Sequence, residues 1–571
     1  MNKTEVADIL DAIGTLLELK GENPFKSRAY HNAAQTITGL DQDLEDLVQN
    51  KQLTSIKGIG EAIAEKITTL VSMGKLPYYE ELQKSLPSGL MDLIRIQGLG
   101  PKRAKILYDK LKIKGIPDLE KAIHEGKIAK LEGFGEKSQN NILKGLEFLN
   151  KHSEKHLYDE AFAAAESILA ELKKIPEVRR TSVCGSLRRH KEIIGDADIL
   201  VSSKKGEGVL ERVIRFPQVE RVLGQGETKA SVLLREGTQV DVRVVEDQQF
   251  PYALHYFTGS KEHNIALRQR AIARGWKLSE YGLFDKGEKL IPCKDEAELF
   301  AKLGLAYIPP ELREDHGEIE AAEKGALPVL IEPKDIRGVF HVHSTWSDGR
   351  APLEAMVAEA ERLGWDYVGI SDHSKSAAYA KGLTEDRVRE QGLAIEKLRK
   401  KFKIHIFWGT ECDILKDGSL DYSDPVLAEY NFVIASVHSN FTLSEADMTR
   451  RIQKALRNKY VTILGHMTGR VLLEREGYAV NQTEILKTAS DYGVAVELNA
   501  SPHRFDIDWR QLPKAKELGV RISINPDAHA VEGLGVVPFG VGIARKGWLS
   551  KEDVLNTMPL ARITSWLKGR R

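Results

Sequence analysis

The sequence has few cysteines, no long hydrophobic run and no net charge. Its three cysteines show no Cys-x-x-Cys spacing, which excludes a disulfide framework and a thiolate zinc site and predicts a reducing, cytoplasmic setting. No stretch approaches the roughly 18 apolar residues of a membrane span, and the acidic start does not resemble a secretion signal. Lys and Arg together number 83, as do Asp and Glu. Any site for a polyanion must therefore be local.

Length and hydrophobic spacing indicate several globular domains. At about 150 residues per domain, 571 residues allow roughly four. Residues 1–150 place apolar residues three and four apart between Gly-containing turns, which predicts short helices and no strand. From about 181, short β-branched runs mix with helical stretches, which predicts an α+β domain. Residues 311–324 are acidic and predict a solvated entry into a linker. After 334, regular alternation predicts a parallel sheet, either doubly wound or closed as a barrel.

One motif occurs three times near the N-terminus: a hydrophobic-x-Gly-hydrophobic-Gly turn followed by a helix. Each copy predicts a helix-hairpin-helix, and the turns contain three glycine pairs: Gly58 and Gly60, Gly98 and Gly100, and Gly133 and Gly135. Glycine tolerates positive φ, and the N–H groups at such a turn bind phosphate without reading a base. A single copy is about as often only a connection between helices, but three copies favour binding to a DNA backbone.

The second hairpin is also basic. Residues 95–114 hold seven Lys and Arg against one acid, and Lys102, Arg103 and Lys105 lie at the turn. These cations predict phosphate contacts, although a basic run is most often a solvated face.

Three acids predict a metal site in the α+β region. Asp196 and Asp198 are two apart at the start of a predicted strand, so their carboxylates face one side and repel unless a cation lies between them. Asp241 on a neighbouring strand would complete a site for two Mg²⁺ ions, which can activate a hydroxyl and stabilise a leaving phosphate. Alone, an Asp-x-Asp pair is more often a turn at strand entry. Upstream, however, Gly185 and Ser186 lie at a strand-to-helix turn beside two arginines, which suits a triphosphate.

Five motifs in order resemble the family X DNA polymerases over roughly residues 1–315: GSLRR, GDADIL, GETKAS, QVDVRV and YFTGSKEHNIALR. The resemblance implies metal-binding carboxylates at Asp196, Asp198 and Asp241, and triphosphate ligands at Gly185, Ser186 and Arg189. It further implies that Tyr256, Phe257 and Gly259 wall the nucleotide sugar, that Asn264 contacts the incoming base and that Arg268 contacts the template strand. Judged alone, the aromatic pair is more often part of a core.

The family's N-terminal domain often carries a lyase that acts through a lysine Schiff base. Lys66 stands at the matching position, and Tyr30 and Lys26 fit the phosphate-binding neighbourhood. Ala62, however, occupies a position where the family pattern has lysine. A surface Lys66 without chemistry is therefore the alternative.

The last third of the chain contains half of the 16 histidines, most of them directly after an apolar strand. Six of these eight histidines and three acids form a set of nine ligand-type residues, with His405 and His503 outside it: His341, His343, Asp348, His373, Glu411, His438, His466, Asp527 and His529. Ligands at the ends of successive parallel strands converge on one mouth. A lone histidine is more often a core residue, but this recurrence predicts up to three ions of Mn²⁺, Zn²⁺ or Fe²⁺.

This segment resembles the polymerase and histidinol phosphatase (PHP) domain, with all nine expected ligand positions filled. The resemblance implies a distorted (βα)₇ barrel with metal-dependent phosphoesterase chemistry. A family X polymerase followed by PHP is similar to the bacterial and archaeal PolX proteins. The implied domains are an 8-kDa-like DNA-end-binding domain (1–80), a fingers-like helix-hairpin-helix domain (81–150), a nucleotidyltransferase palm (151–245), a thumb-like domain (246–315), a linker (316–334) and PHP (335–571).

The resemblances together imply a monomeric, cytoplasmic repair polymerase that binds gapped or nicked DNA and dNTPs and uses two Mg²⁺ in the palm. The PHP domain is expected to use Mn²⁺ or Zn²⁺ as a 3′–5′ exonuclease, and relatives suggest endonuclease action at abasic sites. Two alternatives stay open. The chain could be a DNA-end-binding scaffold with vestigial catalysis, or a polymerase fused to a small-molecule phosphoesterase.

Overall fold

The computed structural model of this protein describes residues 1–569 except residues 2, 39, 41, 43, 97, 153 and 154. Its chain divides into two compact units. The first comprises residues 1–153 with the short segment 348–355, and the second comprises 154–347 with 356–571. Within the described residues, no helix is long and apolar enough to cross a membrane.

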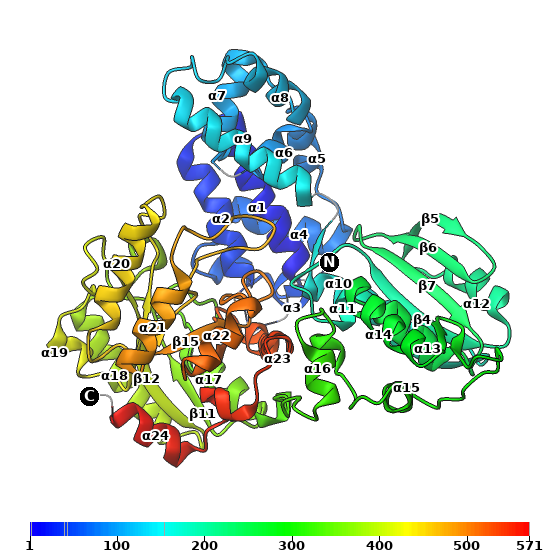
Figure 1. The fold of residues 1–571 in the computed structure, drawn as a ribbon. Helices are drawn as coiled ribbons and strands as arrows, with labels where there is room; N and C mark the ends of the chain where they lie inside the picture. The colour runs from blue at the N-terminus through cyan, green and yellow to red at the C-terminus, as the bar shows by residue number, and fades with distance from the viewer. Residues whose placement is uncertain are drawn as a thin grey trace. The chain divides into compact units, whose positions relative to one another are not determined.

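The N-terminal region consists of helices and turns, as its hydrophobic spacing predicts (Figure 1). The α-helices are α1 (Lys3–Lys20), α2 (Pro24–Thr38), α3 (Leu44–Gln49), α4 (Glu61–Met73), α5 (Pro77–Lys84), α6 (Leu90–Ile94), α7 (Pro101–Leu111), α8 (Ile116–His124) and α9 (Gly135–His152). Two separate hydrophobic cores hold them, one among α1–α5 and one mainly among α6–α9. No strand occurs among the described residues of this region.

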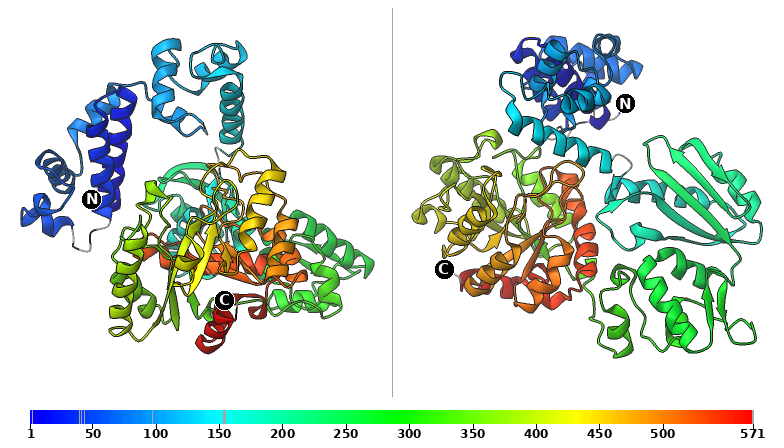
Figure 2. Two further views of the ribbon diagram at one scale, coloured as in Figure 1. Left: turned by 90° about the vertical axis from the view of Figure 1, so that its left-hand side faces the viewer. Right: turned by 45° about the horizontal axis from the view of Figure 1, so that its top comes forward.

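The palm is a five-stranded sheet with the order β2-β4-β7-β6-β5. The right-hand view of Figure 2 shows this sheet in cyan to green. Its strands are β2 (Val178–Val183), β4 (Ala197–Ser203), β5 (Val219–Gln225), β6 (Lys229–Leu234) and β7 (Gln239–Val245). The central strands β4 and β7 are paired in parallel, and the other pairs are antiparallel. Helices α10 (Tyr158–Leu172) and α13 (Phe250–Thr258) contact β4, while α12 (Gly206–Val213) contacts β7.

The thumb region follows as a small helical domain with its own core. It contains α13, α14 (Lys261–Ala273), the hairpin β8 (Lys277–Ser279) and β9 (Gly282–Phe284), and α15 (Glu296–Lys302). Tyr252, Leu267 and Phe300 lie fully buried in its core.

The C-terminal domain is a parallel sheet, as predicted. It has seven strands, each paired with its neighbour in sequence, which is the order of a barrel rather than of a doubly wound sheet. Its strands are β10 (Gly338–Val339), β11 (Tyr367–Ile370), β12 (His405–Asp413), β13 (Phe432–Ser436), β14 (Ile463–Leu464), β15 (Ala495–Asn499) and β16 (Ile522–Asn525). Helices α17 (Leu353–Arg362), α18 (Glu385–Arg399), α20 (Glu445–Leu456), α21 (Gln482–Tyr492), α22 (Leu512–Glu517) and α23 (Val537–Lys546) connect or follow them, and α24 (Leu560–Lys568) ends the chain. A parallel bridge between Val342 and Ala528 brings the two edge strands together, so the sheet is nearly a closed barrel.

The prediction of a solvated segment over 311–324 is wrong for its key acids. Glu311 and Glu318 are buried, and the carboxylate of Glu314 is only 8% exposed. Glu318 lies in the short helix α16 (Glu318–Glu323), where it pairs with the buried His263. The acidic composition reflects carboxylates that face buried cations, which sequence alone does not distinguish from solvated acids.

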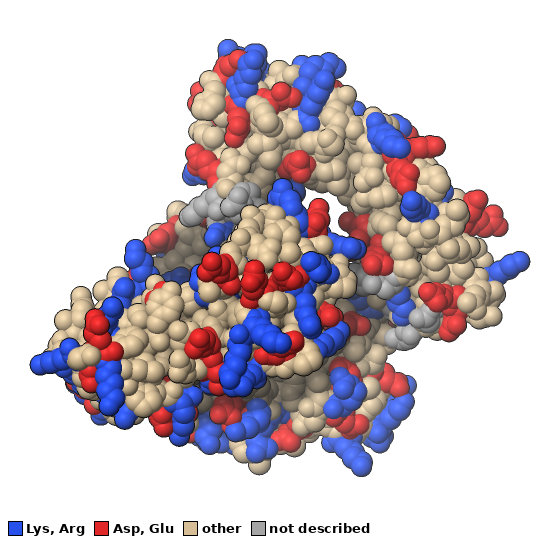
Figure 3. Space-filling view, turned by 90° about the vertical axis from the view of Figure 1, so that its right-hand side faces the viewer, with Lys and Arg blue, Asp and Glu red and all other residues tan. Residues whose placement is uncertain are grey.

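The surface itself carries mixed charge. On the face drawn in Figure 3, basic and acidic side chains are interspersed. This agrees with the equal totals of basic and acidic residues in the sequence.

Replacing Glu318 by alanine should destabilise the second unit. The carboxylate is hydrogen bonded to His263 Nδ1 and accepts from the backbone N–H groups of Asp315 and His316, all of which would lose their partner. Because buried partners left unpaired cost several kcal/mol, we expect the midpoint of thermal unfolding to fall by roughly 5 °C or more. Glu320→Ala, an exposed position on the same helix, is the matched control and should leave the midpoint nearly unchanged. Equal midpoints for the two variants would contradict the role of Glu318.

Candidate functional site

The palm carboxylates lie together on the parallel pair of strands. Asp198 of β4 is directly opposite Asp241 of β7, and Asp196 precedes β4. The three carboxylates place one oxygen each within 4.8 Å of one another. Burial and the negative charges of Asp196 and Asp241 raise the pKa of the Asp198 carboxyl to about 7. A divalent cation would relieve this repulsion, so the oxygen-only donor set fits Mg²⁺.

One cation of the chain already faces this cluster. Lys229, the first residue of β6, forms an ion pair with Asp241, and Gln239 donates a hydrogen bond to the same carboxylate over 3.0 Å. Although burial opposes it, these groups hold the pKa of Asp241 below its usual range. The sequence analysis did not single out Lys229, although it stands in the motif GETKAS.

The turn before the carboxylates requires glycine. Gly185 has φ +61°, and a Cβ at this position would collide with Asp198 Oδ2. It opens the short helix α11 (Gly185–Arg188), which contains Ser186 and follows the buried Cys184. The structure therefore brings the predicted phosphate turn directly against the predicted metal ligands.

The two arginines of GSLRR point to different partners. Arg188 bonds Thr258 Oγ1 over 2.6 Å and forms an ion pair with the buried Glu296, which also pairs with Arg313. Arg189 donates from Nε to Glu314 over 3.1 Å and from Nη1 to the carbonyl oxygen of Thr258. Of the two arginines, Arg189 is therefore the one beside Gly259 and within electrostatic range of Asp198.

The residues implied for nucleotide and template contact cluster at the junction of α13 and α14. The rings of Tyr256 and Phe257 are 5.1 Å apart and perpendicular, and Arg243 lies over Phe257. Asn264 donates to the carbonyl of Tyr256 over 2.7 Å, and Arg268 Nε donates to the carbonyl of Asn264 over 3.3 Å.

The hairpin glycines adopt the conformation that the motif requires. Gly58, Gly98 and Gly133 have φ between +84° and +101°. Gly60 and Gly100 precede the first residues of α4 and α7, whereas Gly135 begins α9 with φ +63°. A Cβ would meet no described atom within 4 Å at Gly98, Gly133 and Gly135, so their positive φ rather than packing explains these glycines. Gly60 and Gly100 also have open space at Cβ, but their extended backbones, with φ −80° and −74°, suit any residue.

The basic residues of the second hairpin differ in their contacts. Arg103 donates to the carbonyl of Gly98 over 3.0 Å and lies over the ring of Phe134. Lys105 pairs with Asp109 over 2.9 Å, while Lys102 follows Pro101 at the start of α7.

Lys66 lies on α4 and is half-buried. Its ammonium donates to the carbonyl of Ala62 over 3.0 Å and lies 4.9 Å from the ring centre of Tyr78, which stacks on the buried Tyr30. Lys26 pairs with Glu22 over 3.9 Å. Lyase chemistry at Lys66 stays a prediction.

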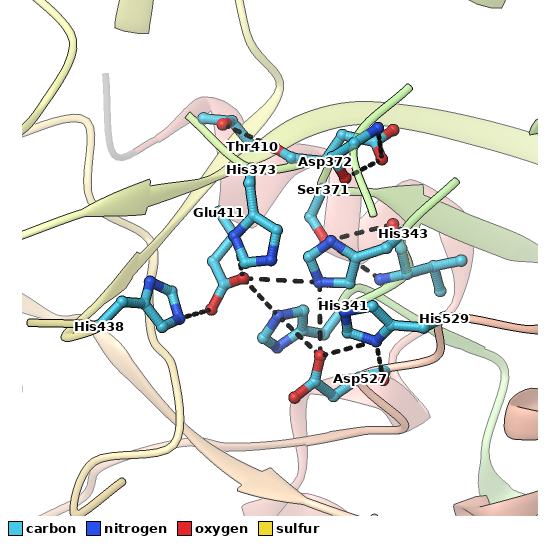
Figure 4. A network of polar contacts seen from close by, with 12 residues as sticks. His341, His343, Ser371, Asp372, His373, Thr410, Glu411, His438, Asp527 and His529 are labelled. Atoms are coloured by element: carbon cyan, nitrogen blue, oxygen red, sulfur yellow. Dashed lines mark hydrogen bonds and ion pairs between the residues drawn. The ribbon is translucent and has the colours of Figure 1, made fainter. Parts of the chain in front are cut away.

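The barrel brings the predicted histidines and acids to one end of its strands (Figure 4). The nine predicted residues form four overlapping groups, and within each group the ligand atoms lie within 4.8 Å of one another. The groups are His343 with Asp348, His373 and His529; His341 with His343 and Asp527; His341 with Glu411 and His466; and His373 with Glu411 and His438. Successive strand ends supply them, because parallel strands all finish on the same side.

Glu411 on β12 is the centre of this cluster. Its two carboxylate oxygens lie 3.0 Å from His373 Nδ1, 3.0 Å from His466 Nε2 and 3.2 Å from His438 Nε2. Burial opposes ionisation, but His341, His438 and His373 hold the pKa of Glu411 well below its usual range. A single carboxylate shared by several imidazoles is suited to bridging metal ions.

Further acids orient the histidine rings, and sequence analysis missed them. His341 Nδ1 is 2.6 Å from Glu497 on β15, and His438 Nδ1 is 2.6 Å from Asp413. Such partners fix the ring and direct the other nitrogen toward a metal. Glu497 and Asp413 follow the same strand-end pattern as the ligands, and that position was the available signal.

The donor set fits transition metal ions. The buried Nε2 of His341 lies 3.3 Å from Glu411 and 3.4 Å from Asp527, yet among the described residues it has no hydrogen-bond partner. A metal ion bound between the two carboxylates would give this buried nitrogen the partner that it lacks. Imidazole with carboxylate, and no thiolate, suits Zn²⁺, Mn²⁺ or Fe²⁺.

Comparison with protein families agrees with this architecture. Residues 1–76 match a helix-hairpin-helix domain, 90–147 a SAM-like helix-hairpin-helix tandem, 253–314 the DNA polymerase beta thumb and 340–501 the PHP domain. The helix-hairpin-helix, thumb and PHP predictions are thereby confirmed.

Individual relatives match either all of the chain or one part. DNA polymerase/3′-5′ exonuclease PolX of Bacillus subtilis is 39% identical over 574 residues, covering 100% of both chains. A probable phosphatase of Thermoanaerobacter sp. (strain X514) is 27% identical over 231 residues, which cover 36% of this chain and 91% of the relative. Rat DNA polymerase lambda is 24% identical over 311 residues, covering 49% of this chain and 52% of the relative. Since it is 39% identical to a PolX protein over the full length of both chains, this chain belongs to the PolX family.

Proposed function

We propose that this protein fills short gaps in DNA by template-directed addition of nucleotides in the palm, and that its PHP barrel removes nucleotides in the 3′–5′ direction. The observation that carries the proposal is the presence of two complete and separate ligand clusters in one chain, beside full-length similarity to a DNA polymerase/3′-5′ exonuclease. Complete clusters argue against a scaffold with vestigial catalysis.

In the palm, Asp196, Asp198 and Asp241 would hold two Mg²⁺ ions. Bound there, the ions supply activation of the primer hydroxyl and neutralise charge on the triphosphate. Gly185 and Ser186 would receive the phosphates at their turn, and Arg189 would add its guanidinium. The predicted domain boundaries and the monomeric state belong to the same proposal.

At the junction of α13 and α14, the incoming nucleotide would be oriented by four residues. Tyr256, Phe257 and Gly259 would lie along the sugar, and Asn264 would meet the base. Arg268 would contact the template strand. The chain of hydrogen bonds from Arg268 through Asn264 to Tyr256 supports a common role, because movement of one residue shifts the next.

In the barrel, the nine-residue set would hold Mn²⁺ or Zn²⁺. When bound, such ions would activate water for attack and stabilise charge on the scissile phosphate. The 27% identity of this segment to a probable phosphatase favours a second candidate, a small-molecule phosphoesterase. The helix-hairpin-helix motifs favour DNA as the substrate, since they suit a phosphate backbone.

Asp198→Asn should abolish nucleotide addition. The change removes one negative charge from a cluster that must hold two dications, so we expect extension of a primer on gapped DNA to fall by about 10²-fold or more. DNA binding and 3′–5′ degradation should persist, because the barrel cluster shares no residue with the palm cluster. Normal extension by the variant would refute the palm assignment.

The double variant His341→Ala/His343→Ala should show the opposite pattern. We expect loss of 3′–5′ degradation of a labelled primer and a lower content of bound transition metal, with gap filling in Mg²⁺ preserved. Metal analysis and a melting curve should accompany the assay, because metal binding can contribute to folding. If Asp198→Asn alone removed both activities, one site would perform both reactions.

The triple variant Lys102→Ala/Arg103→Ala/Lys105→Ala should weaken binding to gapped DNA equally for different sequences. If all three cations neutralise phosphates, the slope of log K against log salt should flatten by up to roughly three units. The contacts of Arg103 and Lys105 within the hairpin are compatible with this role, since both side chains stay at the surface.

A triple alanine variant of exposed lysines outside the hairpin turns, at Lys75, Lys121 and Lys127, is the control. It should leave the salt slope near that of the unchanged protein. A sequence-dependent loss in the hairpin variant would instead show that these residues read bases.

A further inference from the structure

Lys546 is a fully buried cation at the end of α23, in the PHP domain. Its ammonium donates to the carbonyl of Arg189 over 2.9 Å, to the carboxylate of Glu314 over 2.6 Å and to the carbonyl of Glu311 over 3.4 Å. All three acceptors belong to the palm or the thumb region. Among the described residues, the ammonium has no hydrogen-bond acceptor in its own domain, and there it lies only over the ring of Trp509.

Glu314 connects this lysine to the palm arginine. One oxygen of its carboxylate accepts from Arg189 Nε over 3.1 Å and also from Lys546, while the other pairs with Lys191 over 3.0 Å. Burial opposes ionisation, but the three cations lower the pKa of Glu314 to about 2. Lys546 therefore contacts Arg189 in two ways. It donates a hydrogen bond to the backbone carbonyl, and it binds the carboxylate of Glu314 that accepts from the guanidinium.

The guanidinium of Arg189 keeps one nitrogen free to donate hydrogen bonds to a ligand. Its Nε and Nη1 are engaged by Glu314 and Thr258, whereas Nη2 has no hydrogen-bond partner among the described residues. Its positive charge reaches the metal-binding carboxylate Asp198. Arg189 directly follows the phosphate turn in the chain, and its backbone N–H donates to the carbonyl of Gly185 over 3.3 Å. The side chain thus keeps one donor nitrogen without a partner in the described residues, on a residue that is anchored to this turn.

Close packing prevents the palm segment after Arg189 from shifting against α23. His190 has φ +50° and stacks on Tyr158, with ring centres 4.8 Å apart. A Cβ on Gly542 of α23 would collide with the His190 ring, so glycine is what allows this approach. The segment that carries Arg189 is therefore fixed between the two domains.

We infer that Lys546, although it belongs to the PHP domain, is a positioning residue for nucleotide addition in the palm, acting on the incoming triphosphate through Glu314 and Arg189. This inference rests on the proposed role of Arg189 as a triphosphate ligand. It assigns to the PHP domain a second task that is independent of its metals, because Lys546 supports both the backbone carbonyl of Arg189 and the carboxylate of Glu314 that holds its guanidinium.

The test compares Lys546→Met with Arg545→Met in the full-length protein. Arg545 is the neighbouring residue and crosses the same interface to Glu311 over 2.6 Å, but among the described residues it forms no hydrogen bond or ion pair with Glu314 or Arg189. Single-nucleotide insertion on gapped DNA gives KM for dNTP and kcat. We expect Lys546→Met to raise KM about tenfold, the effect of losing one well-placed charged contact, with kcat changed by less than about threefold. Arg545→Met should leave KM within about twofold.

The Arg189→Ala background separates this inference from the proposal on which it rests. Arg189→Ala alone should raise KM for dNTP, and adding Lys546→Met should then raise it no further. If Arg189→Ala leaves KM unchanged, the proposed role of Arg189 is wrong and the inference fails with it. If Arg189→Ala raises KM but Lys546→Met does not, or if the effects of the two changes multiply, only the inference is overturned.

Glu314→Gln is a second test of the connection between Lys546 and Arg189, and it keeps the shape of the side chain. It should raise KM for dNTP in the same direction as Lys546→Met, since it removes the charge that joins Lys546 to Arg189. Degradation of a labelled 3′ end and the thermal midpoint report whether each variant is folded. If Lys546→Met does not fold, Glu314→Gln decides: an unchanged KM overturns the inference. Equal KM increases for Lys546→Met and Arg545→Met would also overturn it, because the interface would then act only as a structural contact.

Discussion

Parallel pairing of neighbouring strands positions both ligand clusters. In the palm, β4 and β7 are the parallel pair within an otherwise antiparallel sheet, and their register sets Asp198 opposite Asp241. In the barrel, all seven strands are parallel to their neighbours, so residues at their ends meet at one mouth. An antiparallel neighbour would place the corresponding side chain at the far edge of the sheet. The chemistry that we propose for each domain depends on this arrangement.

Carboxylates that lie close together repel one another, and this repulsion is reduced in different ways in the palm cluster and in the barrel cluster. The palm leaves Asp198 with a pKa raised to about 7, relieved only in part by Lys229 beside Asp241. In the barrel, Glu411 lies among imidazoles that favour its charged form, and the carboxylates of Glu411 and Asp413 in turn raise the pKa of His438 to about 10 despite its burial. Both arrangements are suited to cations, but the palm relies on them more strongly because it contains mainly acids.

Buried ion pairs also join the polymerase part to the barrel. Glu192 pairs with Arg470 over 2.6 Å, Glu311 pairs with Arg545 over 2.6 Å, and Lys546 reaches Glu314. Such pairs add little net stability compared with apolar packing, but breaking one leaves a buried charge without compensation. They therefore fix the register of the two domains within the second unit, which is the setting in which a PHP residue can act on the palm.

The sequence by itself determined the helical N-terminal region, the α+β palm, the parallel C-terminal sheet and the residues that form each ligand cluster. It could do so because hydrophobic periodicity is local, and because the ligand residues recur at strand ends. Only the tertiary structure decided that Arg188 pairs with Glu296 while Arg189 faces Glu314, and that Glu497 orients His341. It also showed that acids predicted to be solvated are buried against Arg545 and Lys546, more than 200 residues away in the chain. A charged side chain has the same sequence signature in water and in a buried ion pair, since the difference lies in partners that only folding brings near.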